Sequence, residues 1–339
     1  MTLGTALAIA AGVVLLGLAL HALWSVRRGR VKRLDAETLE RTEPPLHADV
    51  APALAEGAPA VQPRRRSAKL DALIDVIVPL TMEAPVSGDI AAAHLPASRR
   101  AGAKPMFIEG LTVDTAEWET PTPGAAYGEF QAGVQLANRS GALNEIEYSE
   151  FVQKVQDFAD GVGALPDFPD MLDVIARARE LDGFASPLDA QLTLNLRANS
   201  VAWSVAYVQQ TAARHGFVPG ALPGRLVLPA AEEGAPPVLV LGFDAQTALS
   251  DDPQNAALRE VDLSLDVPQT AEAAEPFPAW HRAATGLAED LDATAVDSVG
   301  APVSLHAFNA IGKELASMYQ TLESRDLAAG SVVARRLFS

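Results

Sequence analysis

The chain has 339 residues, of which 49% are apolar and 20% charged, a length that predicts about two domains. Because it contains no cysteine, disulfides, thiolate metal sites and cysteine nucleophiles are excluded. Its 26 basic and 43 acidic residues give a formal net charge of −17, which argues against binding to the phosphate backbone of nucleic acids.

The first predicted element is a membrane span. Residues 3–26 form an apolar run without a charged residue, long enough for a helix to cross a hydrocarbon core. Nothing basic precedes the run, and the basic sequence VRRGRVKR follows it, which distinguishes it from a cleaved signal peptide. We therefore expect residues 1–33 to be a single-pass anchor with an outside N-terminus and a cytoplasmic C-terminal region.

Residues 34–69 predict a disordered linker. They hold five prolines, many alanines and almost no large apolar residue, so they cannot bury enough surface to offset the entropy of ordering. The prolines favour an extended chain. Such a linker lets an attached domain sample a volume away from the bilayer.

Two copies of one pattern of elements follow the linker. The first copy, residues 70–185, contains alternating apolar and polar runs that predict strands and periodic runs that predict helices. The strands are expected over 72–81, 104–113 and 129–137, and the helices over 87–95, 146–163 and 170–184. Asp170 is the expected N-cap of the last of these helices.

The second copy, residues 186–330, repeats the pattern, and residues 331–339 form a tail. Its strands are expected over 190–198, 224–230, 237–244 and 260–268, and its helices over 204–217, 277–293 and 304–325. Together the two copies predict an α+β fold of split β-α-β type, with antiparallel sheets and helices packed on one face. The other face of such a sheet is open and can receive a peptide.

The motifs of common enzymes are missing. The six histidines include no pair at metal-ligand spacing, and the sequence has no G-x-S-x-G elbow and no P-loop. The predicted strands also lack the stacked aromatic residues of RNA-binding sheets. We therefore expect a protein that is not an enzyme, with no cofactor, metal, nucleic acid or small-molecule substrate.

Several stretches resemble the ZipA family of bacterial cell-division proteins. In the second copy they are AARHGFVPGALPGRLVL at 212–228, EVDLSLDVP at 260–268 and the tail SRDLAAGSVVARRLFS at 324–339. In the first copy, the stretches 104–113, 130–156 and 168–182 are similar to the longer ZipA-like proteins of betaproteobacteria. The family's binding domain corresponds to residues 186–330, and its anchor to residues 1–33.

The resemblance implies a function in cell division. The family's C-terminal domain binds the C-terminal tail of FtsZ on the open face of its sheet, which tethers FtsZ polymers to the inner membrane at midcell and stabilises the division ring. For this chain the resemblance implies a partner, FtsZ, and attachment to the inner membrane through residues 3–26. The alternative is a membrane-anchored cytoplasmic scaffold for a different division or envelope partner.

Alternation along the strands assigns the residues that face outward from the second copy, and these are the expected partner-binding residues. They are Thr193, Asn195, Arg197, Arg225, Val227, Val240, Gly242, Asp262 and Ser264. Gln191 and Asp266 belong to the same face. An aromatic position of the family falls on Ser264, so this face is more polar than the resemblance implies. The peptide then binds with a different set of contacts, or it binds elsewhere.

The first copy is the other candidate for the peptide site. Leu73, Ile77, Phe107 and Val113 place apolar residues on more than one side of its sheet. The alternative interpretation is that the two copies bury these residues against each other.

Overall fold

The computed structural model describes residues 69–339, apart from residues 233, 250–255, 298 and 304. The predicted span of residues 3–26 and all but the last residue of the predicted linker lie outside the described residues. In the part of the chain that is described, no helix combines the length and the apolar character that crossing a membrane requires. The predicted fold class is corrected accordingly: the structure is an α+β fold of antiparallel sheets and helices, without a membrane-spanning helix among its described residues.

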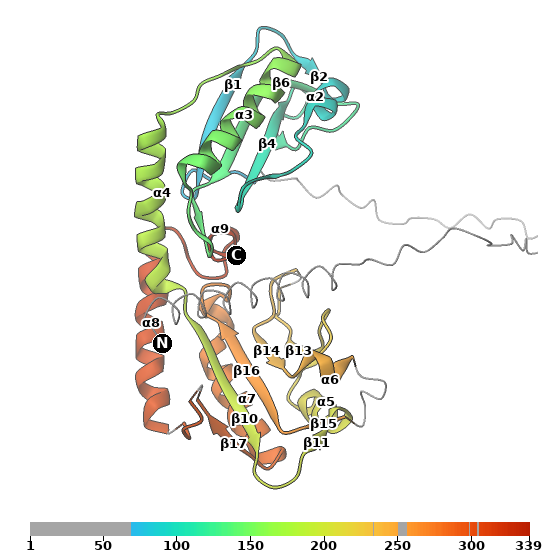
Figure 1. The fold of residues 1–339 in the computed structure, drawn as a ribbon, viewed down its shortest axis with the longest axis vertical. Helices are drawn as coiled ribbons and strands as arrows, with labels where there is room; N and C mark the ends of the chain where they lie inside the picture. Colours follow the sequence, from blue (N-terminus) through green and yellow to red (C-terminus); the bar gives the residue numbers. More distant parts are fainter. Residues whose placement is uncertain (1–68, 233, 250–255, 298, 304) are drawn as a thin grey trace, which may run out of the picture. The chain divides into compact units, whose positions relative to one another are not determined.

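The first sheet has the strand order β3-β4-β6-β1-β9, with β2 paired to β6 and β5 to β4 (Figure 1). Its strands are β1 (Asp75–Thr81), β2 (Val86–Ser87), β3 (Arg100–Ala101), β4 (Lys104–Thr112), β5 (Trp118–Glu119), β6 (Ala126–Gln135) and β9 (Leu165–Pro166). Helix α2 (Gly88–His94) follows β2, and helix α4 (Met171–Ala185) follows β9. A small hairpin of β7 (Ala137–Asn138) and β8 (Gly141–Ala142) leads from β6 towards helix α3 (Glu145–Val162).

Helix α3 lies across β1, β6 and β4 (Figure 1). It begins at a capping box, in which the Asn144 side chain accepts from backbone N–H groups and the Glu147 side chain accepts from the Asn144 N–H. It ends at Gly163, whose φ of 71° is a left-handed conformation that glycine adopts without strain. Phe151 and Phe158 are fully buried against the sheet, so the apolar face of the helix closes one side of it.

The second sheet has the order β12-β13-β14-β16-β10-β17. Its strands are β10 (Gln191–Ala198), β12 (Val218–Pro219), β13 (Arg225–Leu228), β14 (Leu239–Gly242), β16 (Glu260–Asp266) and β17 (Ala293–Val296), and β11 (Trp203–Ser204) pairs separately with β15 (Ala257–Leu258). The predicted strand over 237–244 is shortened to β14 because Pro236 and Pro237 have no N–H to offer a neighbouring strand.

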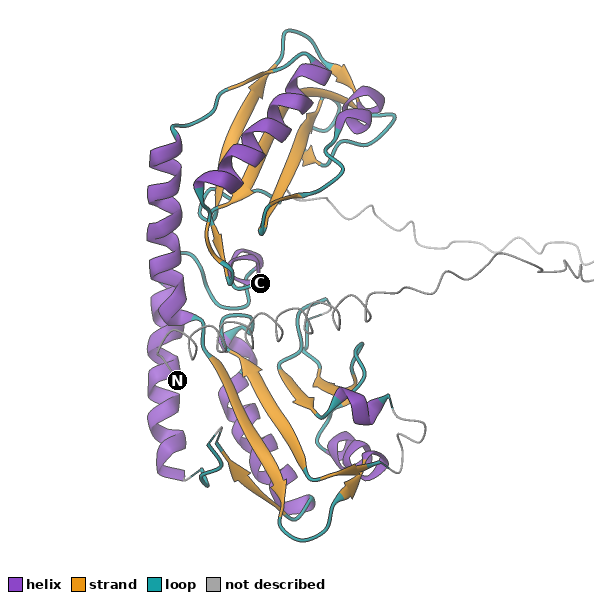
Figure 2. Cartoon of the chain, viewed as in Figure 1, coloured by secondary structure: helices purple, strands orange, loops and turns teal. Residues whose placement is uncertain are grey.

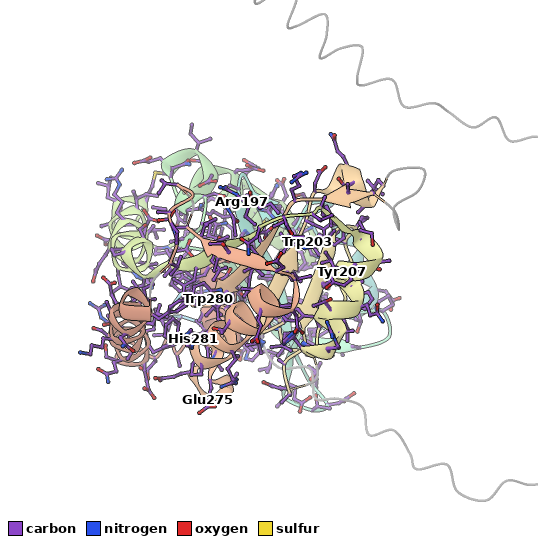
Figure 3. All side chains as sticks on the ribbon, turned by 90° about the horizontal axis from the view of Figure 1, so that it is seen from below. Arg197, Trp203, Tyr207, Glu275, Trp280 and His281 are labelled. Carbon is purple, nitrogen blue, oxygen red and sulfur yellow. The ribbon has the colours of Figure 1, made fainter. Side chains whose placement is uncertain are left out.

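Helices cover one face of this sheet. They are α5 (Val205–Arg214), α7 (Pro276–Asp290) and α8 (Leu305–Glu323), with the short α6 (Ala245–Ala248) beside β14. Trp280 of α7 is buried, and its indole N–H donates to the Leu263 carbonyl. Arg197, on the uncovered face of β10, and Trp280, on the helix side, are both labelled in Figure 3. The helices therefore leave the second face of the sheet open.

The two sheets share one connection order. In each, a long strand (β1 or β10) is followed by a short strand and a helix (α2 or α5), and the strand beside the long one (β6 or β16) leads into a long helix. An edge strand (β9 or β17) and a final helix (α4 or α8) complete the pattern. The second sheet has the edge strand β12, whereas the first has β5 beside β4, and β2 joins the first sheet while β11 pairs with β15 outside the second.

The C-terminal residues contact both sheets. Helix α9 (Val332–Leu337) places Arg336 against the buried carboxylate of Asp75 in β1, with an Nη2–Oδ1 distance of 2.6 Å. The Gln269 amide, which follows β16, donates to the carbonyls of Arg335 and Phe338. Since Phe338 is also fully buried, the end of the chain is part of the core rather than a free tail.

Candidate functional site

The predicted partner-binding residues lie on the face of the second sheet that no helix covers. The strand register places most of them in two rows across the sheet: Arg225, Gly242, Asp262 and Asn195 form one row, and Val227, Val240, Ser264 and Thr193 form the other. Arg197 lies opposite Glu260, with which it forms an ion pair of 3.3 Å. Alternation along the strands thus assigns these residues to the face that the described helices leave uncovered.

A groove of about 650 Å³ is hollowed into this face. Five of the predicted residues line it: Arg225, Val240, Gly242, Asp262 and Ser264. The loop between β13 and β14 (teal in Figure 2) contributes Pro236 and Pro237 to its wall. Thr193, Asn195, Arg197 and Val227 are not among the groove-lining residues, although they share its sheet face. The groove therefore runs along the β13–β14–β16 side of the sheet.

The groove holds a half-buried carboxylate. Asp262 stands opposite Gly242, and a Cβ atom on that glycine would come within 2.6 Å of Asp262 Oδ1. Burial raises the pKa of Asp262, while its own backbone N–H and the charge of Arg225 act in the opposite direction. Asp262 forms no ion pair with any residue that the structure describes, so its charge is compensated only at a distance.

One wall residue of the groove comes from the first copy. Arg139, in the turn between β7 and β8, forms ion pairs with Asp189 (2.6 Å) and with Asp266 (2.9 Å) of the second sheet. Burial alone would lower the pKa of Arg139, but its hydrogen bonds to the two carboxylates raise that pKa above the ordinary value. Arg139 therefore stays charged and neutralises one end of the groove.

A buried lysine holds that turn in place. Lys104 of β4 is 1% exposed, and its Nζ donates to Asn138 Oδ1 (2.7 Å) and to the Gly141 carbonyl (2.6 Å). Burial lowers the pKa of Lys104. Sequence reasoning missed Arg139 because its partners lie 50 and 127 residues away and no local pattern marks such a contact.

The alternative peptide site on the first copy is occupied by the chain itself. Lys69 and Leu70 lie on the open face of the first sheet, where the Lys69 N–H donates to the Glu109 carboxylate. The Leu70 side chain fills the space above Gly133, since a Cβ atom there would clash with it. Residues that precede β1 thus cover part of this face.

The alternative interpretation, that the two copies bury four apolar residues against each other, is wrong for Leu73 and Val113. Leu73 is 44% exposed and Val113 is 54% exposed, while Ile77 is half-buried. Phe107 is half-buried beneath the cationic groups of Lys69 and Arg336, which lie 5.5 and 5.3 Å from its ring centroid. The side chains of Lys69 and Arg336, rather than the second sheet, cover Phe107.

The groove offers hydrogen-bonding groups, opposite charges and proline and valine surface, which are the means by which proteins hold extended peptides. In the described ranges, no cluster of three or more histidine or acidic side chains is arranged to hold a metal ion. A search of protein-family models and a search of curated proteins both found no match to the chain.

Proposed function

We propose that this chain is a ZipA-type division protein whose second sheet binds the C-terminal tail of FtsZ. The observation that carries the proposal is the groove on the uncovered face of β13, β14 and β16, because this is the face to which the sequence resemblance assigns the peptide. Helices close the opposite face, and the chain's own residues occupy the corresponding face of the first sheet.

The proposed mode of binding uses both apolar and polar contacts. Val240, Pro236 and Pro237 supply apolar surface, and the half-buried Ser264 supplies a hydroxyl in the row that crosses the sheet. A modest affinity for one peptide suffices, since polymerised FtsZ presents many tails and rebinding follows each release. Tethering to the inner membrane at midcell is the part of the proposal that depends on residues 1–68.

The test is fluorescence anisotropy with a labelled FtsZ C-terminal tail peptide and the full-length chain. We expect saturable binding, and we expect Val240→Glu to weaken it by about tenfold or more, which corresponds to about 1.4 kcal/mol. Val201→Glu is the matched control, because Val201 is 74% exposed in the loop between β10 and β11 and does not line the groove. Absence of binding, or equal weakening by both variants, would refute the proposal.

A second candidate function is favoured by the polarity of the groove. Arg225, Asp262 and Ser264 occupy a face that the family resemblance implies to be largely apolar, and this suits a scaffold for a different division or envelope partner. Localisation in cells depleted of FtsZ separates the two candidates. A chain that binds FtsZ loses its midcell position, whereas a scaffold for another partner keeps it.

A further inference from the structure

We infer that the groove recognises a basic side chain of the bound peptide through Asp262, whose carboxylate lies over Gly242. The inference rests on the proposed function and adds the chemistry of recognition. It is carried by the charged residues on this face, because they differ in whether they already form an ion pair with another described residue.

Asp262 differs from the other acidic residues of the open face in its ion pairing. Glu260 is paired with Arg197, and Asp266 is paired with Arg139. Among the described residues, Asp262 has no such partner, although it is less exposed than a surface carboxylate and lies in the groove. A carboxylate held in this way carries a desolvation cost that a ligand cation can offset.

Gly242 leaves room for the carboxylate of Asp262. Any side chain at residue 242 would meet that carboxyl group, because a Cβ atom there would lie 2.6 and 2.7 Å from its two oxygens. The Asp262 carboxylate therefore lies over the glycine, in the row that runs from Arg225 on β13 to β16. A long side chain of a peptide can reach this carboxylate from the open side of the sheet.

Arg225 determines how the charged groups of a bound peptide are oriented across the groove. It lies on the far side of Gly242 and is exposed, so water solvates its guanidinium and screens its interactions. Its charge acts to lower the pKa of Asp262, but this effect is smaller than the rise in pKa that burial causes. A peptide is therefore expected to place its basic group towards β16 and any acidic group towards β13.

The test compares two peptides against three full-length proteins. The peptides are the FtsZ C-terminal tail and the same tail with every Lys and Arg replaced by Gln. The proteins are the wild type, Asp262→Asn and the control Glu260→Gln, which removes an acid on the same strand and face that Arg197 already neutralises. Asp262→Asn keeps the shape of the side chain, and circular dichroism checks that the variant is folded.

We expect Asp262→Asn to weaken binding of the native tail by about tenfold and to leave the Gln-substituted tail unchanged, as a double-mutant cycle requires for a direct contact. Glu260→Gln should change both affinities by less than about twofold. If the wild type binds the native and the substituted tail equally well, the inference is overturned and the proposed function stands. If the wild type binds neither tail, both are overturned.

Discussion

Asp262 places a half-buried carboxylate in the groove, and its raised pKa has a consequence for stability as well as for binding. Because burial makes its folded-state pKa higher than the unfolded value of 3.8, the folded protein binds the proton more tightly than the unfolded chain does. The ionised form therefore destabilises the fold above the folded-state pKa, and this cost disappears as pH falls below the unfolded value.

We expect Asp262→Asn to raise the free energy of unfolding at pH 7, because it removes a charge that burial disfavours. The gain should shrink as pH is lowered through the folded-state pKa and vanish below about pH 3, where both states are protonated. Urea denaturation of both proteins at a series of pH values measures this. A gain that is independent of pH would show that the charge is not its cause.

At the scale of elements, the sequence allows the strands and helices to be predicted because their signals are local. Asp170 caps α4 as expected, and the alternation in EVDLSLDVP gives the buried and half-buried residues of β16. The same alternation predicts which residues face the groove. It cannot predict the groove itself, whose wall needs the loop with Pro236 and the distant turn with Arg139.

The capping box of α3 permits a prediction about one element. Asn144→Ala removes the acceptor for the N–H groups of Ile146 and Glu147, and we expect it to lower the free energy of unfolding by about 1 kcal/mol. Asn144→Ser should cost little, since serine is an equally good N-cap. Chemical denaturation measures both variants, and equal losses in the two would contradict the role of the cap.

At the scale of the whole molecule, long-range contacts join the two sheets, and these are what sequence patterns could not reveal. Arg336 reaches Asp75 across 261 residues, and Gln135 donates to the Arg336 carbonyl across 201 residues. Neither pair has a spacing that helix or strand periodicity would mark. The sequence resemblance to the ZipA family includes residues 324–339, but it did not show that these residues contact the first sheet.

The Asp75–Arg336 pair predicts a large effect from one substitution. Asp75 is 1% exposed, and burial raises its pKa although hydrogen bonds and charge from Arg336 act against this. Arg336→Ala leaves that buried carboxylate without its cationic partner, with only the Asp71 N–H donating to it among the described residues, so we expect a loss of about 3–5 kcal/mol. The neighbouring Arg335→Ala serves as control, with an expected change below about 0.5 kcal/mol. Thermal and urea unfolding compare them, and similar losses would refute the prediction.

The segment of Lys69 and Leu70 has a mechanical consequence. Both lie on the first sheet, where the Lys69 N–H donates to the Glu109 carboxylate and the Arg336 guanidinium donates to the Lys69 carbonyl. A pulling force that arrives along the chain from its N-terminal side reaches this segment before it reaches β1. Peeling this segment away breaks two hydrogen bonds and lifts Leu70 off Gly133, so it yields first and shields β1 from the initial load.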